Sequence, residues 1–156
     1  MNDDAESSKI VLNITPQTHV RATQGDRIYF RIPRDKLRPA GLKRLLRLER
    51  YNEYKIAVSA LAKSKRYTTR EQGEHITFYI PVSASWSKKK KAELHLQIHQ
   101  EKPDIDNLLK AFFDSLMFED KHIGDVRITK RWVNQERGWI EIVRSNPTYS
   151  SPNNLI

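Results

Sequence analysis

The sequence predicts an α+β fold, in which two main helices lie on one side of a mixed, largely antiparallel sheet. Two observations support this prediction. Short segments rich in β-branched and aromatic residues recur along the chain, and they are interrupted by segments whose apolar residues follow helical spacing. Strand patterns come first, followed by a long helix, one central strand, a short helix and a final strand pair.

The strand segments are bounded by turn residues, and the helix segments have one apolar face. Pro103 suits the entrance of the second helix, whose stripe includes Leu109, Phe112 and Leu116. The first two strands are expected to form an antiparallel pair and the last two to pair with each other. The expected strands are residues 9–14, 26–32, 75–82, 123–133 and 138–143, and the expected helices are residues 42–62 and 105–117.

The length of 156 residues fits one domain, which we expect to span residues 1–144 and to be followed by a flexible polar tail over residues 145–156. The chain has no cysteine, which excludes disulfides, a thiolate zinc site and a cysteine nucleophile. Its start is acidic and polar, and no apolar run is long enough to cross a membrane. We therefore expect a soluble cytoplasmic protein with no membrane partner.

The formal net charge of +9 favours a polyanionic partner, with nucleic acid as the first expectation. Basic residues are concentrated between Arg34 and Arg70, where twelve Lys or Arg face three acidic residues. This surface is either a solvated helix face or a phosphate-binding face. Lys88, Lys89, Lys90 and Lys91 form either a solvated loop or helix start or a phosphate clamp, and Trp86 beside them either stacks on a base or anchors the loop.

An acidic cluster interrupts this basic chain between residues 102 and 125. Asp104 and Asp106 lie at the expected helix start, where two close carboxylates repel each other unless a cation lies between them. Carboxylate oxygens suit a hard divalent ion such as Mg²⁺ or Mn²⁺. The alternative is structural: Asp104 is an N-cap, Asp106 is a first-turn acid, and Asp106, Lys110 and Asp114 form a charge ladder.

A second acidic pair, Glu119 and Asp120, follows the helix and favours the metal-binding interpretation. Carboxylates from two elements around one cation are common in phosphodiesterases, where the ion activates water and stabilises phosphoryl charge. Lys110 is either a residue that orients or balances the attacked phosphate or a member of the charge ladder.

Other catalytic patterns are missing from the sequence. There is no glycine-rich phosphate loop and no serine–histidine elbow, so we expect no nucleotide cofactor. His95 and His99 are spaced for one helix face but lack a third ligand, and the histidines are interpreted as surface or structural residues.

The strings "SWSKKKK", "HQEKPDIDNLLKAFFDSL" and "EDKHI" within residues 85–123 resemble the RusA family of Holliday junction resolvases, common in phages and prophages. The resemblance implies a homodimer that binds a four-way DNA junction and makes paired nicks with Mg²⁺ or Mn²⁺. It also implies that the protein acts in the cytoplasm of a bacterial or phage-infected host cell. By motif, the catalytic aspartates would be Asp104, Asp106 and Asp120, with Lys110 as the functional lysine and Glu119 at the first position of the downstream acidic pair. Lys88 to Lys91 and Lys102 match basic positions suited to junction phosphates.

The chain departs from the family pattern at two points. The connection "SLMF" before the acidic pair is short, and Glu119 replaces an aspartate.

The basic charge, the acidic cluster and the family resemblance together predict a metal-dependent, structure-selective DNA endonuclease. The alternatives are a non-catalytic branched-DNA-binding protein of the same fold, a general metal-dependent nuclease acting on flaps or single strands, and a structural dimer module.

Overall fold

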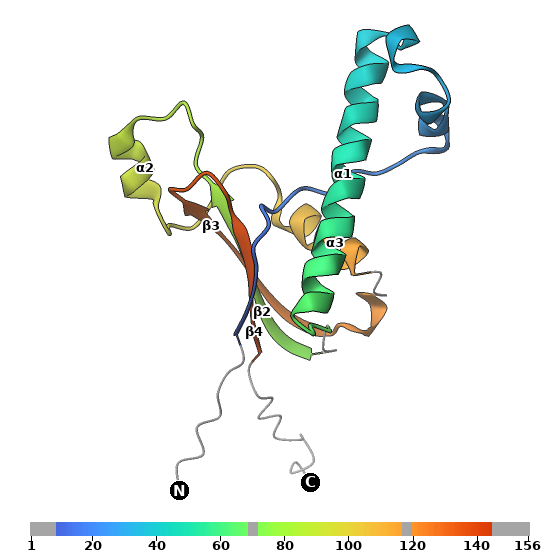
Figure 1. The fold of residues 1–156 in the computed structure, drawn as a ribbon. Helices are drawn as coiled ribbons and strands as arrows, with labels where there is room; N and C mark the ends of the chain where they lie inside the picture. Colours follow the sequence, from blue (N-terminus) through green and yellow to red (C-terminus); the bar gives the residue numbers. More distant parts are fainter. Residues whose placement is uncertain (1–8, 69–71, 117–119, 145–156) are drawn as a thin grey trace, which may run out of the picture.

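The computed structural model describes residues 9–68, 72–116 and 120–144. The tail expected over residues 145–156 lies outside this part of the chain. The α+β prediction is confirmed: a four-stranded sheet packs against two main helices. Figure 1 shows these helices, α1 and α3, on the same side of the twisted sheet.

The sheet has the strand order β1–β4–β2–β3. The strand β4 pairs antiparallel with both β1 and β2, whereas β2 and β3 run parallel, so the sheet is mixed and largely antiparallel as predicted. A parallel pair needs a long crossover, and here residues 82–124 supply it. The strands are β1 Lys9–Leu12, β2 Gln72–Pro81, β3 Asp125–Val133 and β4 Trp139–Arg144.

The prediction of an early strand pair was wrong. Residues 26–32 do not form a strand, because Gln24–Phe30 is the 3-10 helix η1, and β1 pairs with β4 instead. The apolar residues in this segment mimic a strand pattern. The buried Asp26 within it, however, bonds to α1 rather than to a sheet.

The prediction that the last two strands pair with each other was also wrong, because β2 lies between β3 and β4. The connection between β3 and β4 crosses the end of β2 in close contact. A Cβ atom placed on Gly138 would lie only 2.0 Å from the carbonyl oxygen of Tyr79, so only glycine fits there without a shift. The N–H of Gly138 donates to Oγ1 of Thr15 at 3.0 Å, which fixes the crossing.

The two predicted helices are present with slightly different bounds. The helix α1 spans Pro39–Ser64, with a proline in its first turn, and α3 spans Ile105–Ser115. Their apolar faces meet the sheet residues Ile76, Phe78, Ile140 and Ile142, which are fully buried. Phe112 of α3 packs edge-on against Phe78, with ring centroids 6.2 Å apart. This core holds α3 firmly against the sheet.

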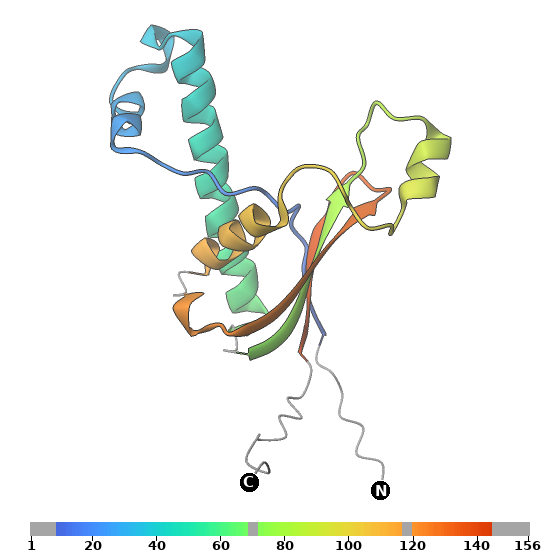
Figure 2. The same cartoon turned by 180° about the vertical axis from the view of Figure 1, so that it is seen from behind.

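The short helix α2, Lys88–Leu94, lies within the crossover. Ser87 is its N-cap and accepts a hydrogen bond from the N–H of Lys90, so the lysine run does begin a helix. Figures 1 and 2 show α2 on the opposite side of the sheet from α1. No helix in the described ranges is both long and apolar enough to cross a membrane.

Residues 20–37 form a segment that we call the arm. It contains η1 and the 3-10 helix η2, Arg34–Lys36, and it packs against the N-terminal part of α1. Both ribbon views show the arm and this end of α1 projecting beyond the sheet and α3 (Figures 1 and 2). The molecule therefore has a body and a projection.

Candidate active site

A cavity of about 450 Å³ lies where the start of α3 meets β3. Two of the predicted metal-binding aspartates line it together. The lining residues are Ile98, His99, Asp104, Ile105, Asp106, Ile128, Thr129 and Lys130.

Asp104 and Asp106 keep their carboxylates exposed at this cavity. Asp104 occupies the N-cap position of α3 with extended backbone angles, yet its side chain makes no capping hydrogen bond. Asp106 is in the first turn, while Leu108 and Phe112 of the same helix are fully buried on the other side. The N-cap interpretation of the Asp104 side chain is therefore not supported, and both carboxylates are available to a ligand.

Lys130 of β3 fixes the loop that leads into Asp104. Its Nζ donates a hydrogen bond to the carbonyl oxygen of Pro103 at 2.6 Å and another to the carbonyl oxygen of Glu101. These bonds join the sheet to the chain just before α3. They hold the two aspartates in place and bring an ammonium group to the cavity wall.

His99 is a buried residue of this site that sequence reasoning treated as surface or structural. Its ring stacks on Trp132 with centroids 3.5 Å apart, and its Nδ1 accepts the N–H of Glu101 at 3.2 Å. Burial, assisted by Lys130, lowers the pKa of His99. The neutral ring then carries its proton on Nε2, because Nδ1 is the acceptor. Within the described part of the chain, Nε2 has no hydrogen-bond partner.

His95 and His99 do not share a helix face, because α2 ends at Leu94. His95 instead accepts the N–H of Asn134 through Nδ1. The backbone N–H of His99 donates to the carbonyl oxygen of Lys130 on β3. The short bridge to β3, which the sequence does not reveal, is what brings His99 to the cavity.

Lys110 and Asp114 lie apart from the cavity lining. Lys110 is exposed on α3. Asp114 accepts a hydrogen bond from the Tyr51 hydroxyl at 3.1 Å and lies 3.2 Å from Nε2 of His19. Burial, together with the charge of Asp114, raises the pKa of Tyr51. Asp114 thus joins α3 to α1, and no ion pair with Lys110 is found within the described ranges.

The second acidic pair is described only in part. Asp120 begins the 3-10 helix η3, Asp120–His122, which follows α3 and precedes β3. Its side chain and the whole of Glu119 lie outside the described residues. Among the side chains that are described, no three His, Asp or Glu group together as a metal site. Asp104 and Asp106 are therefore the described half of the predicted site.

The predicted DNA-binding residues differ in exposure and in their contacts. The exposed ones are Lys88, Lys89, Lys90 and Lys102, whereas Lys91 and Trp86 are half-buried. Lys90 places Nζ 3.7 Å from the centroid of the Trp86 ring, and Lys91 donates to a backbone carbonyl at 2.9 Å.

Trp86 has a structural contact that favours the anchoring interpretation. Its ring packs against Trp132 with centroids 5.2 Å apart, and Trp132 in turn stacks on His99. A row of rings therefore connects α2 to the cavity.

Comparison with known protein families shows which family this chain belongs to. A model of the endodeoxyribonuclease RusA family matches residues 31–143, most of the chain. The chain belongs to the RusA family. The match includes the cavity and every predicted site residue. RusA membership implies a Holliday-junction-resolving endonuclease. A search of curated proteins found no match.

Proposed function

We propose that this chain is a Mg²⁺-dependent endonuclease that resolves four-way DNA junctions by paired nicks in recombination and repair, and that Mn²⁺ substitutes for Mg²⁺. One observation carries the proposal. In a chain of the RusA family, two exposed aspartates share a cavity with the lysine that holds the preceding loop, and the Asp104 side chain makes no capping hydrogen bond. A purely structural role for Asp104 would need the capping bond that it lacks.

The donor set at the cavity fits a hard divalent ion. Asp104 and Asp106, two positions apart, offer carboxylate oxygens to one cavity, and a cation bound between them would relieve their mutual repulsion. We propose Asp104, Asp106 and Asp120 as ligands, with Glu119 as a further one. A bound Mg²⁺ would activate water and stabilise the charge that develops on the phosphate.

The other residues position the DNA and the aspartates. Lys130 keeps the loop before Asp104 in place through its two carbonyl contacts, which limits the movement of the ligands. His99 supports the same loop from beneath the cavity wall, because its buried ring stacks on Trp132 and its Nδ1 accepts the N–H of Glu101. Lys110 balances phosphate charge from the exposed side of α3.

The basic surfaces capture the junction. Lys88, Lys89 and Lys102 are exposed near the cavity-bearing elements, and phosphate contacts of this kind release counterions on binding. Paired nicks require two active sites, so we propose a homodimer in which a two-fold axis relates them. Light scattering of the purified chain should give the mass of a dimer, and a monomer at working concentration would contradict paired cutting.

The test is cleavage of a labelled four-way junction beside linear duplex of the same sequence, with Mg²⁺ or with EDTA. We expect symmetric nicks in the junction alone, and only with the metal. Asp106→Asn should lower the cleavage rate by about a hundredfold or more, because it removes a charged oxygen ligand. Its affinity for the junction in EDTA should not fall.

Glu53→Gln is the matched control, since it removes the same charge from an exposed position on α1. It should cleave at the wild-type rate. Tight junction binding without cleavage under any divalent metal would instead support the non-catalytic DNA-binding alternative.

A further inference from the structure

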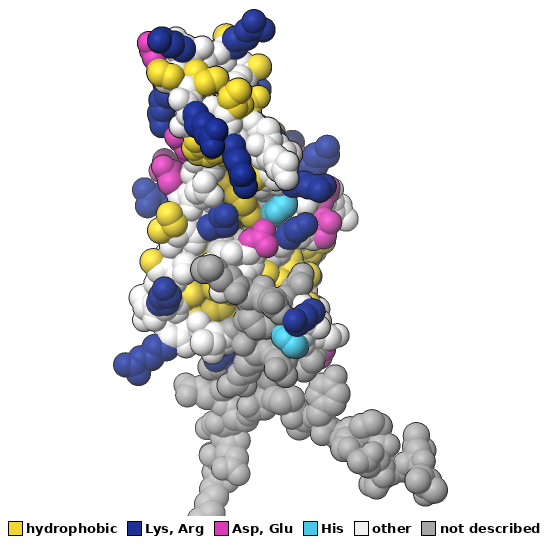
Figure 3. Space-filling model, turned by 90° about the vertical axis from the view of Figure 1, so that its right-hand side faces the viewer, with side chains coloured by type: hydrophobic (Ala, Val, Ile, Leu, Met, Phe, Trp, Pro, Cys, Tyr) yellow, Lys and Arg dark blue, Asp and Glu magenta, His cyan; other side chains and the backbone are white. Residues whose placement is uncertain are grey.

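The arm exposes large apolar side chains, which is unusual for so charged a segment. Ile28 is 54% exposed and Phe30 is 55% exposed, both on η1. Between them, Tyr29 turns toward α1 and packs at Gly41, where an added Cβ atom would lie 3.1 Å from the Tyr29 ring. Figure 3 shows hydrophobic side chains among Lys and Arg at this end of the molecule.

A hollow of about 620 Å³ lies on the arm, with Ile28 in its wall. It is lined by Gln24, Gly25, Arg27, Ile28 and Arg31. Its wall combines two guanidinium groups with one aliphatic side chain. This combination matches a nucleotide, because arginines bind phosphate oxygens while an apolar or aromatic surface contacts the face of a base.

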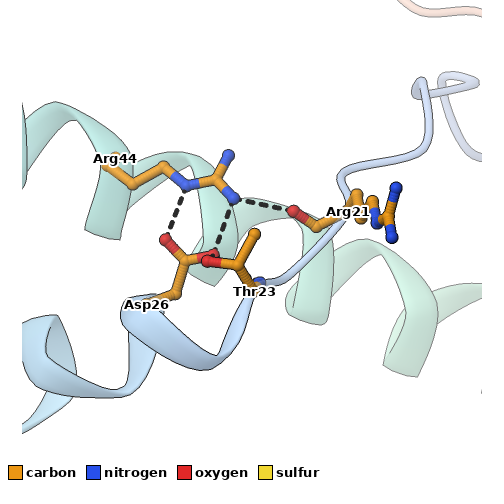
Figure 4. A network of polar contacts seen from close by, with 4 residues as sticks. All are labelled: Arg21, Thr23, Asp26 and Arg44. Carbon is orange, nitrogen blue, oxygen red and sulfur yellow. Dashed lines mark hydrogen bonds and ion pairs between the residues drawn. The ribbon is translucent and has the colours of Figure 1, made fainter.

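The arm is held in one position by a compact ion pair. Arg44 of α1 donates to both carboxylate oxygens of Asp26, at 2.9 and 2.7 Å, and also to the carbonyl oxygen of Arg21 at 2.7 Å. Figure 4 shows these contacts of Arg44, and the N–H of Thr23 donates to the same carboxylate. The Arg44 guanidinium holds the pKa of Asp26 well below its usual range. The apolar residues are therefore presented on a fixed support.

The charge of this region selects the partner. Residues 20–50 hold ten Lys or Arg against three Asp or Glu, an excess of seven. Asp26 is paired with Arg44 and Glu49 with Arg34, so the exposed charge is overwhelmingly positive. A second copy of the arm would be repelled, whereas a DNA backbone would be attracted.

We propose that the arm binds an unstacked nucleotide at the branch point of DNA, with its phosphate on Arg27 and Arg31 and its base against Ile28, while the exposed Phe30 supplies a second apolar contact to the DNA. This inference rests on the proposed action on four-way junctions. Bases in linear duplex are stacked and paired, whereas bases at a branch point are more easily unstacked. The arm thus favours branched over linear DNA, from a region that begins ahead of the family match.

The experiment measures binding in EDTA, so that the DNA stays intact. A four-way junction carries the fluorescent base 2-aminopurine at its branch point, and a linear duplex of the same sequence is the reference. The double variant Ile28→Ala/Phe30→Ala should bind the junction about tenfold more weakly, as expected for loss of one base contact. Its affinity for the duplex should change less than twofold. The change in 2-aminopurine fluorescence that the wild type causes on binding should be absent with the double variant.

Ile56→Ala is the matched control, because Ile56 is 71% exposed on α1 away from the arm. It should bind like the wild type. The second variant is Arg27→Gln/Arg31→Gln. The affinity of this variant should fall less steeply with salt, so that the slope of log affinity against log salt is smaller in magnitude by about 2. An unchanged salt slope in that variant would contradict the phosphate contacts.

The outcomes separate this inference from the proposed function. A wild type that cleaves junctions, with a double variant that binds them equally well, would overturn the arm inference alone. An equal loss of affinity for junction and duplex would overturn its selectivity for branch points. A wild type with no preference for the junction over the duplex would overturn both.

Discussion

The arm and residues 86–94, which we call the α2 region, are both basic, but they are held in place by different forces. The α2 region is anchored by rings, with Trp86 against Trp132 and Trp132 stacked on His99. The arm is anchored by the ion pair between Asp26 and Arg44. The first attachment is largely apolar and leads to the cavity, whereas the second is electrostatic and lies on the projection.

This difference shows how one chain can hold its two proposed DNA-binding surfaces independently of each other. Ring packing depends on buried area and shape, and it is little affected by salt. A partly exposed ion pair depends on both partners and on their protonation. Changes in one attachment should therefore leave the other intact, and three experiments separate them.

The largest effect is expected for Trp132→Ala. Trp132 is 7% exposed and contacts both Trp86 and His99, so its truncation leaves a cavity and should lower the free energy of unfolding by about 3 kcal/mol or more. Urea unfolding measures this change. Trp86→Ala, at a half-buried ring, should cost about 1 kcal/mol. Equal losses in the two variants would contradict the central place of Trp132 in the ring row.

A smaller and more local effect is expected for Arg44→Gln. The variant leaves the Asp26 carboxylate without its guanidinium, so the arm should detach from α1 more often. Limited trypsin digestion should cut within the arm about tenfold faster, while the urea midpoint of the body changes little.

Glu49→Gln provides the control for the Arg44 variant. It breaks the more exposed contact between the arm and α1, in which Arg34 is the partner. Because exposed pairs contribute little, digestion of the arm should accelerate less than about threefold. Faster digestion than in Arg44→Gln would place the main attachment at Arg34 and overturn the comparison.

The smallest effect is a dependence on pH that should separate the two attachments. The pKa of His99 is lower in the folded chain, mainly through burial, so neutral His99 stabilises the fold above the unfolded value of about 6.5. This contribution to stability is lost as the pH falls from the unfolded pKa toward the lower pKa of His99 in the folded chain. The melting temperature should therefore fall between pH 7.5 and pH 5.5, and less so in His99→Gln.

Asp26 should respond in a more acidic window. Its folded pKa is also lowered, so its contribution is present above the unfolded value of about 3.9 and is lost only below it. The control for the His99 experiment is His75→Gln. Burial also lowers the pKa of His75, but this histidine lies away from the row of rings. Fluorescence anisotropy of a dye attached within the arm measures how firmly the arm is held. A fall in anisotropy already at pH 5.5 would contradict the expectation that Asp26 responds only at more acidic pH than His99.

Local patterns were sufficient for much of the fold. The stripe of α3 and the β-branched run of β2 are readable because helical and strand periodicities are local properties of the chain. The segment "DRIYFRI" was misread because a short apolar run does not distinguish a strand from a 3-10 turn. Its buried Asp26, whose partner is 18 residues away, decides the outcome.

The same division holds for the candidate site. Asp104 and Asp106 could be singled out because their spacing and the lack of compensating charge are visible in the chain. Lys130 and His99 could not, because they reach the cavity through the parallel pairing of β3 with β2 and the bridge of Ile98 to Arg131. Sheet pairing depends on contacts between distant segments, which no local pattern encodes.

The sequence by itself determined the α+β class, the two main helices, the absence of cysteine chemistry, the basic character and the acidic pair at the start of α3. Only the tertiary structure decided that β2 separates β3 from β4, that Trp86 packs against Trp132, and that the arm projects beyond the sheet and α3. The physical reason is that composition and periodicity act over a few residues. Pairing order, ring packing and ion pairs such as Asp26 with Arg44 depend on which distant segments meet when the core closes.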